Sequence, residues 1–299
     1  MNHLDYNIPS IPQKNGFVGI RIICAIIVLY EHFVILLGIN LPILNIRGIA
    51  VNVFFILSGF WVTRSFFTSD SIISFYKKRI KKIFPPYITI VLGSALLLSF
   101  LSQLSLLEYF SNNGFWKYLV ANLSTLNFLH PDLPGVFNGE PVNGSLWTIK
   151  IELGFYVVLP FIIYLCIWKN ENSFRNRCLL ILIILYTLSA LYTIIIAHVI
   201  EYYNVSSSFA NQLPAYMSYF STGIFFFFFY NKISSMLRKV IIPSAIIVLF
   251  CIIFHNNILI ALFEPITLGI VVMYFALYAK PLFIFSKIYD CSYWLYLIH

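Results

Sequence analysis

Long apolar runs follow one another along almost the whole chain. A helix needs about 20 predominantly apolar residues to cross the hydrocarbon core of a bilayer. By that criterion the sequence predicts eight membrane spans and the start of a ninth. We place them near residues 17–39, 47–67, 84–105, 147–168, 178–199, 213–230, 240–255 and 258–279, with the ninth beginning near 283–289 and still apolar at His299. The prediction is an all-α, polytopic membrane bundle in which residues 1–299 form one transmembrane domain, truncated in its last helix.

The composition excludes the main alternative classes of protein. Of the 299 residues, 60% are hydrophobic and 10% are charged, whereas roughly 25% are charged in an average soluble domain. The mean hydropathy is +0.87. A soluble globule cannot cover its surface with so few charges, and the net charge of +8 is not gathered on a soluble basic face. We therefore expect the lipid bilayer as the main surroundings and no nucleic-acid partner.

Basic residues collect in alternate connections between the predicted spans. Segment 76–82 reads Tyr-Lys-Lys-Arg-Ile-Lys-Lys and precedes the third span. Further basic residues follow the fourth, sixth and eighth spans: Lys169, Arg175, Arg177, Lys232, Arg238, Lys239, Lys280 and Lys287. Because cytoplasmic loops are enriched in Lys and Arg, nine alternating spans with a cytoplasmic N-terminus satisfy every one of these signals. The long outer loop, 106–146, is then either a connector or a lid that binds an acceptor, with an interfacial helix expected at 115–129.

Ionisable residues inside the first predicted span mark a candidate site. Such residues cost a few kcal/mol in a membrane, so they usually face a cavity or a partner. Arg21 and His32 are eleven residues apart, which places them on one helix face about 16 Å apart. A cation near the cytoplasm suits an anionic ligand, and a neutral imidazole deeper in the span suits a base. Alternatively, Arg21 reaches lipid headgroups and His32 bonds a neighbouring helix.

Two carboxylates accompany this pair. Glu31 is adjacent to His32 in the sequence, and it can line the same cavity, orient the imidazole or pair with Lys150. Glu152 lies in the fourth span at a predicted depth similar to that of His32. It can orient a substrate hydroxyl, tune the histidine, or belong to a buried ion pair. The five cysteines are scattered and show no metal-binding spacing, so we expect no metal site.

Five stretches of the sequence, taken in order, carry a resemblance. They are Arg21 with His32; Asn52-Val-Phe-Phe-Ile-Leu-Ser-Gly-Phe60; Phe75-Tyr-Lys-Lys-Arg-Ile-Lys-Lys-Ile-Phe-Pro-Pro-Tyr87; Gly144-Ser-Leu-Trp-Thr-Ile-Lys-Ile-Glu-Leu-Gly-Phe-Tyr156; and Ser292-Tyr-Trp-Leu-Tyr-Leu-Ile-His299. Each stretch is weak alone, but their order and spacing across nearly the whole chain resemble the membrane acyltransferase-3 family of bacterial O-acyltransferases. The family often has an acid at the position of Asn52, and its domain continues beyond the position of His299.

The resemblance implies a domain of about ten helices in the bacterial cytoplasmic membrane. It implies transfer of an acyl group, usually acetyl, from cytosolic acetyl-CoA to a hydroxyl of a carbohydrate such as O-antigen, capsule or exopolysaccharide. We expect His32 to act as the catalytic base or to carry the acetyl group transiently, with Glu152 and Glu31 orienting or tuning it. We expect the donor phosphates to be bound by basic side chains near the cytoplasm: Arg21, Arg64, Lys78, Arg79 and Lys82. The alternatives are a proton-coupled transporter or flippase and a structural membrane subunit.

Overall fold

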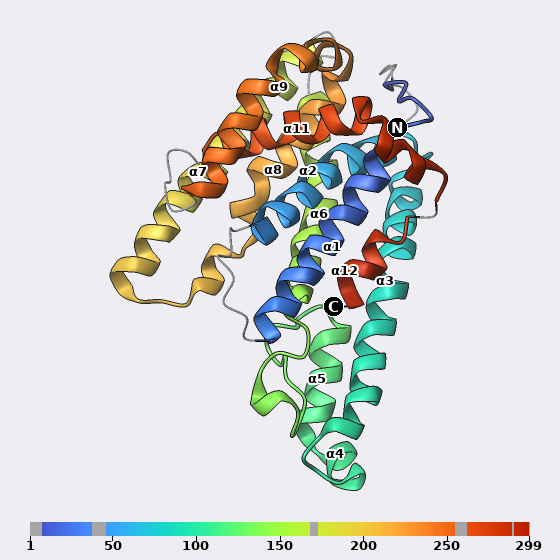
Figure 1. The fold of residues 1–299 in the computed structure, drawn as a ribbon, viewed down its shortest axis with the longest axis vertical. Coiled ribbons are helices and arrows are strands. Elements are labelled where there is room, and N and C mark those ends of the chain that lie inside the picture. Colours follow the sequence, from blue (N-terminus) through green and yellow to red (C-terminus); the bar gives the residue numbers. More distant parts are fainter. Residues whose placement is uncertain (1–7, 38–45, 168–172, 255–261, 289, 299) are drawn as a thin grey trace.

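The described part of the chain is mainly helical. A computed structural model describes residues 8–37, 46–167, 173–254, 262–288 and 290–298, and these contain no strand (Figure 1). The helices are α1 (Phe17–Leu36), α2 (Ile46–Phe67), α3 (Ile72–Leu97), η1 (Leu98–Leu101), α4 (Leu106–Ser111), α5 (Asn113–Leu123), η2 (Phe137–Gly139), η3 (Gly144–Leu146), α6 (Trp147–Ile167), α7 (Phe174–Tyr203), η5 (Ser207–Ala210), α8 (Leu213–Phe228), α9 (Tyr230–Ile253), α11 (Glu264–Tyr278), η6 (Lys280–Lys287) and α12 (Ser292–Ile298).

Several of these helices are long and apolar enough to cross a membrane. Within the described residues they are α1, α2, α3 continued by η1, α6 preceded by η3, α7 and α9. The pair of α11 and η6 also qualifies if it is counted as one span bent by 74°. The protein is therefore a multi-pass helical membrane protein. The count of nine spans stays a prediction, because α8 has only 16 residues and α12 only seven.

The predicted first, second and fourth spans coincide closely with α1, α2 and α6. All four basic segments that we expected to be loops are helical in their described residues. Residues 76–82 lie inside α3, and the residues from Lys232 to Lys239 lie inside α9. Arg175 and Arg177 lie in α7, Lys280 and Lys287 lie in η6, and Lys169 is outside the described residues. These predictions were wrong for the same reason: hydropathy marks only the apolar part of a helix, whereas Lys and Arg are good helix formers and can extend it beyond the apolar run.

The start of α3 explains why its basic segment is helical. The Ser71 side chain caps the helix by accepting a hydrogen bond from the backbone N–H of Ser74 at 3.1 Å. The helix then continues through Pro85 and Pro86, which we had placed at the beginning of a span. Proline lacks a backbone N–H, so the carbonyl groups four residues earlier lose their usual donors.

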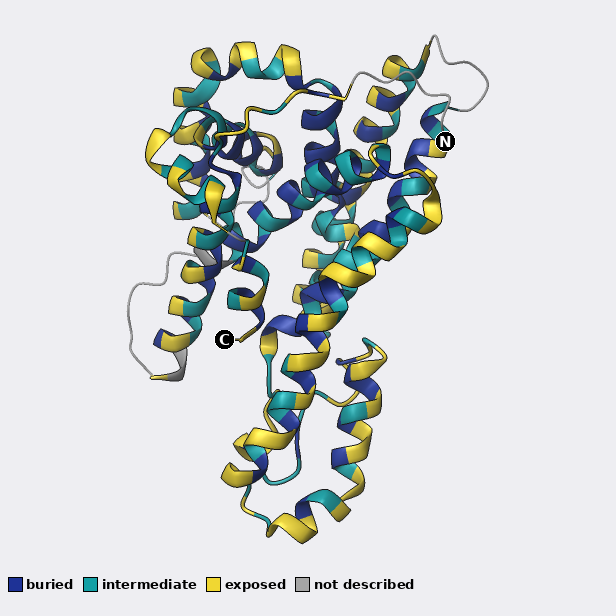
Figure 2. Cartoon of the chain, turned by 90° about the vertical axis from the view of Figure 1, so that its right-hand side faces the viewer, coloured by how far each residue is buried: buried dark blue, intermediate teal, exposed yellow. Residues whose placement is uncertain are grey.

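The long segment after α3 forms an extension at one end of the bundle (Figures 1 and 2). The helix predicted at 115–129 is α5, which ends six residues earlier, at Leu123. It ends there because Thr125 adopts a left-handed conformation with φ of 63°, which a continuing helix excludes. Tyr87 of α3 donates a hydrogen bond to the Asn122 carbonyl at 2.7 Å, and this bond fastens α5 to α3.

The predicted ninth span is also interrupted. The residues from 283 to 287 belong to η6, and Ile288 is extended with φ of −91° and ψ of 143°. The last described helix, α12, therefore starts only at Ser292. It packs between α1 and α3 (Figure 1).

Helix α2 lies at the centre of the bundle. In its apolar window 61% of residues are buried, compared with 11% for α7 and 17% for α9, which face outwards. Gly59 of α2 crosses Gly223 of α8 so closely that a Cβ atom on Gly223 would lie 2.0 Å from the Ile56 carbonyl oxygen. Glycine at both positions, with no Cβ atom, allows the two helices to approach this closely.

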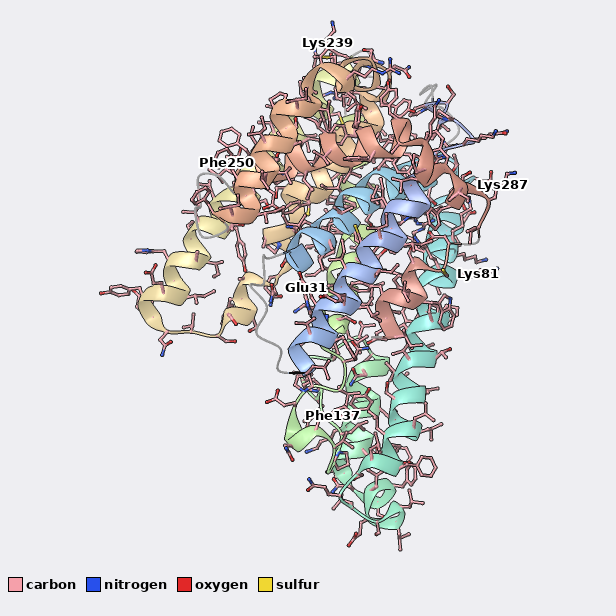
Figure 3. The ribbon with its side chains drawn as sticks, viewed as in Figure 1. Glu31, Lys81, Phe137, Lys239, Phe250 and Lys287 are labelled. Atoms are coloured by element: carbon pink, nitrogen blue, oxygen red, sulfur yellow. The ribbon has the colours of Figure 1, made fainter. Side chains whose placement is uncertain are left out.

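The two halves of the molecule carry different side chains (Figure 3). Lys239 and Lys287 lie in the half of the molecule that holds the N-terminus, and Phe137 lies in the other half. A cytoplasmic N-terminus predicts such a distribution of lysines. The orientation itself stays a prediction.

Candidate active site

Two cavities of different chemistry meet inside the bundle. The first, of about 270 Å³, is lined from α1, α2, α3, α6 and the chain around the start of α12, and we call it the basic cavity. The second, of about 740 Å³, is lined mainly from α1, α2, α6, α7 and α8, and we call it the histidine cavity. Val51 and Tyr296 line both. These two side chains therefore form part of a wall between the cavities.

An ion pair anchors the basic cavity. Nη1 of Arg21 lies 2.8 Å from Oδ2 of Asp290, just before α12. Glu152 lines the same cavity and interacts electrostatically with both Arg21 and Lys82. Analysis of the sequence missed Asp290, although an acid between two apolar segments was a signal available in it.

Arg79 connects α3 to the carboxylate of Glu152. Its Nη2 donates to the Ser65 hydroxyl at 2.9 Å, and its guanidinium lies 5.8 Å from the centre of the Tyr156 ring. The Tyr156 hydroxyl donates a hydrogen bond to Oε1 of Glu152. Tyr156 therefore holds the Glu152 carboxylate in place.

Buried polar atoms without a hydrogen-bond partner concentrate around the basic cavity. In the described part of the chain, these side-chain atoms belong to five residues that line the basic cavity and to one residue elsewhere, Arg177. The five lining atoms are Arg21 Nε, Ser58 Oγ, Trp61 Nε1, Arg79 Nε and Tyr293 Oη. A buried donor left without a partner costs about 1–3 kcal/mol. Because all five groups can donate, the cavity suits a ligand rich in acceptor oxygens.

His32 lines the histidine cavity, and its tautomer follows from one contact. Nδ1 lies 2.8 Å from the Val28 carbonyl oxygen. A carbonyl oxygen only accepts, so in the neutral ring Nδ1 carries the proton and Nε2 carries the lone pair. The rest of the lining combines aromatic faces with hydroxyl and amide groups: Ser145, Trp147, Tyr186, Asn211 and Tyr216. These groups provide apolar contact area and hydrogen bonds, as a hydroxyl-rich ligand requires.

A buried acid borders the histidine cavity from α11. Oε1 of Glu264 accepts hydrogen bonds from Asn52 Nδ2 at 2.8 Å and from the Tyr219 hydroxyl at 3.0 Å. Asn52 occupies the position where the resembling family often has an acid, and here α11 brings a carboxylate to it. We did not single out Glu264 from the sequence. The rule that selected Arg21, an ionisable group inside an apolar span, would also have found it.

The structure separates residues that the sequence analysis grouped together. Arg21, Arg79, Lys82 and Glu152 line the basic cavity, whereas His32 lines the histidine cavity. An equal depth along two helices does not place two side chains in one cavity.

Three further predicted residues lie outside both linings. Nη1 of Arg64 donates to the Pro9 carbonyl at 3.1 Å, and Nζ of Lys78 donates to the Thr68 carbonyl at 3.1 Å. We therefore leave Arg64 and Lys78 out of the proposed donor site. Glu31 is buried on α1 at 8% exposure.

The suggested pairing of Glu31 with Lys150 was wrong. Nζ of Lys150 donates to Gln212 Oε1 at 3.1 Å, and it lies 4.9 Å from the centre of the Phe128 ring. These contacts direct Lys150 towards the start of α8 and the outer segment. Within the described residues no group of three or more His, Cys, Asp or Glu side chains is arranged to hold a metal ion.

Comparison with known proteins decides the family. A family model described as an acyltransferase domain matches residues 15–299. The chain belongs to the acyltransferase-3 family. An O-acetyl transferase of Shigella phage Sf6 is 30% identical over 150 residues, which cover 49% of this chain and 45% of that protein. Nodulation protein 10 of Rhizobium leguminosarum bv. viciae is 29% identical over 170 residues, which cover 53% of this chain and 46% of that protein.

A third relative is the acyltransferase MdmB of Streptomyces mycarofaciens, 30% identical over 120 residues, covering 40% of this chain and 29% of that protein. Each of these three matches thus covers less than half of the relative's own length. No solved structure matches the chain significantly.

Proposed function

We propose that this acyltransferase-3 protein moves an acyl group, most often acetyl, from a cytosolic acyl-CoA to a hydroxyl of a cell-surface or lipid-linked carbohydrate. It acts in the cytoplasmic membrane of a bacterium. The observation that carries the proposal is the pair of cavities: a basic one with unpartnered donors and one that contains His32, meeting at Val51 and Tyr296.

The basic cavity is the proposed donor site. Four basic side chains, Arg21, Arg79, Lys81 and Lys82, line it against two acidic ones, which favours a ligand with phosphate groups. At about 270 Å³ it is slightly below the roughly 300–1,000 Å³ of typical ligand pockets. It therefore admits the acyl-pantetheine arm, while the nucleotide stays near the mouth, beside the outward-lying Lys81 (Figure 3).

The histidine cavity is the proposed acceptor site. Its volume of about 740 Å³ accommodates a glycosyl unit, and its aromatic and hydroxyl lining suits one. In the proposed step the acceptor hydroxyl gives its proton to Nε2 of His32 as its oxygen attacks the thioester carbonyl carbon. The carbon–sulfur bond breaks, and the imidazolium returns the proton to the leaving thiolate. A base of this kind typically contributes ~10²–10⁴-fold to the rate.

The test is the O-acetyl content of the surface polysaccharide in a deletion strain. The strain carries the wild-type gene, His32→Ala, or His198→Ala, matched for membrane abundance. His198 is the control because it is exposed on α7 and outside both cavities. We expect wild type and His198→Ala to restore the acetyl groups. We expect His32→Ala to transfer acetyl groups at least 100-fold more slowly than wild type.

Three results would contradict the proposal. Wild-type transfer by an abundant His32→Ala protein would remove the histidine from the mechanism. An unchanged acetyl content in every strain would reject a carbohydrate acceptor. His32-dependent flux of a solute in the absence of acyl-CoA would instead identify a transporter.

A further inference from the structure

We infer that Tyr296 determines which acyl groups this protein transfers, because its side chain forms part of the wall between the proposed donor and acceptor cavities. The inference rests on the function proposed above and adds a selectivity residue to it. Tyr296 and Val51 are the two residues common to the linings of the basic and histidine cavities. An acyl group that enters from the basic side therefore meets Tyr296 before it reaches the acceptor side.

The contacts of Tyr296 hold its ring across the junction. Its hydroxyl donates to Oγ1 of Thr148 on α6 at 3.1 Å. Its ring packs edge-on against Phe54 of α2, with the ring centres 5.3 Å apart. Thr148 and Phe54 both line the basic cavity, and Tyr296 itself is only 7% exposed. The ring is thus fixed between two other helices rather than lying loosely in open space.

Helix α12, which carries Tyr296, is fastened at both of its ends. At its start, Asp290 pairs with Arg21 and also accepts hydrogen bonds from the backbone N–H and hydroxyl of Ser292. Near its end, Nδ2 of Asn143 donates to the Leu297 carbonyl at 2.8 Å. Because α12 is held at both ends, the position of the wall is fixed relative to the basic cavity.

A fixed wall at this place gives selection by length. The basic cavity has about 270 Å³, whereas the space beyond the wall has about 740 Å³. An acetyl group needs no room beyond the thioester, but each added methylene pushes the chain towards the Tyr296 ring. One methylene in a confined pocket is worth about 10–200-fold in discrimination. Removal of the ring would join the cavities and make room for longer chains.

The experiment compares acyl donors in membrane vesicles that contain the full chain and its native glycan acceptor. Labelled acetyl-, propionyl-, butyryl- and hexanoyl-CoA are supplied, and kcat/KM for incorporation into the glycan is measured for each. The variants are Tyr296→Ala, which removes the ring, and Tyr296→Phe, which removes only the hydroxyl. Val51→Ala opens the same wall from α2, and Tyr216→Ala is the control because Tyr216 lines only the histidine cavity.

We expect wild type and Tyr296→Phe to prefer acetyl over butyryl by at least tenfold. The same ratio should fall at least tenfold in Tyr296→Ala and by a smaller factor in Val51→Ala. Tyr216→Ala changes the rate with all donors together and leaves the ratio unchanged. Because each variant is judged by the ratio of kcat/KM for two donors, a partial loss of folded protein does not alter the measured selectivity.

The outcomes separate this inference from the proposed function. An unchanged ratio in active Tyr296→Ala, or an equal change in Tyr296→Phe, overturns the role of the ring while the transferase function stands. If Tyr296→Ala does not insert, an unchanged ratio in Val51→Ala overturns the role of the wall. If wild type transfers no acyl group from any donor, the proposed function fails and this inference with it.

Discussion

Adding one methyl group where α2 crosses α8 should destabilise the whole bundle. Gly223→Ala introduces a Cβ atom that would lie 2.0 Å from the Ile56 carbonyl oxygen and 2.8 Å from Gly59 Cα. Ordinary contact begins at 3.4 Å, so the two backbones must separate by more than 1 Å. Neither backbone can rotate away in the manner of a side chain, because each is part of a helix.

The magnitude follows from two opposing effects. Overpacking of a well-packed core typically costs about 1–3 kcal/mol, and the approach here is to backbone atoms on both sides of the crossing. Replacing glycine by alanine within a helix stabilises the helix by about 0.5–1 kcal/mol. We expect a net loss of about 1–2 kcal/mol, at the upper end if the helices cannot separate.

The matched control is Gly93→Ala in α3, where a new Cβ atom meets nothing within 4 Å. It gains the same helix propensity without the clash, so it should be neutral or slightly stabilising. The assay is thermal unfolding of the purified proteins in one detergent, with the acyl-transfer rate measured in parallel. An equal Tm for Gly223→Ala and Gly93→Ala would refute the close crossing of α2 and α8.

Two further predictions concern charged contacts. Asp290→Asn removes the anionic partner of Arg21, and it should lower Tm while Glu140→Gln, at an exposed site, leaves Tm unchanged. The loss in free energy of unfolding should be smaller than the about 3–5 kcal/mol found on breaking a fully buried pair, because 28% of the Asp290 side chain is exposed. An unchanged Tm would contradict a structural role for the pair. In the capping box of α4, hydrogen bonds from the Ser105 hydroxyl and backbone N–H lower the pKa of the Glu108 carboxyl. Because the pKa of Glu108 is lower in the folded state, its ionised carboxylate stabilises the helix above the unfolded-state pKa, and this stabilisation is lost as pH falls through the folded-state pKa. Hydrogen exchange of the α4 amides, corrected for intrinsic rates, should therefore become faster on acidification in wild type and not in Glu108→Gln.

Hydropathy predicted the apolar helices well, but it could not predict how far they extend. It located α1, α2 and α6 because each consists of a single apolar run with polar residues at its ends. It failed at α3 and α9, whose N-terminal halves carry basic residues before the apolar run begins. In those segments the backbone hydrogen bonds continue outside the apolar run, and no change of hydrophobicity marks where the helix begins.

Helical periodicity predicted part of the candidate site. It placed Arg21 and His32 on one side of α1, and both line cavities. It could not show that those cavities are separate, because the wall comes from Val51 and Tyr296, which are far apart in the sequence. The same limit applies to Glu152, whose surroundings depend on contacts with α3 and with the segment before α12.

Of the three roles that the sequence left open for Glu152, the division between the cavities favours a place among buried cations over tuning of His32. A carboxylate close to His32 would stabilise the imidazolium form. Glu152 instead lies among Arg21, Lys82 and Arg79, where it offsets part of the repulsion between these cations. The cavity then keeps more basic than acidic side chains, and its cations remain available to an anionic ligand. The base at His32 and the cations that hold the proposed donor therefore act from opposite sides of Tyr296, and the wall between them is where an acyl group would have to pass.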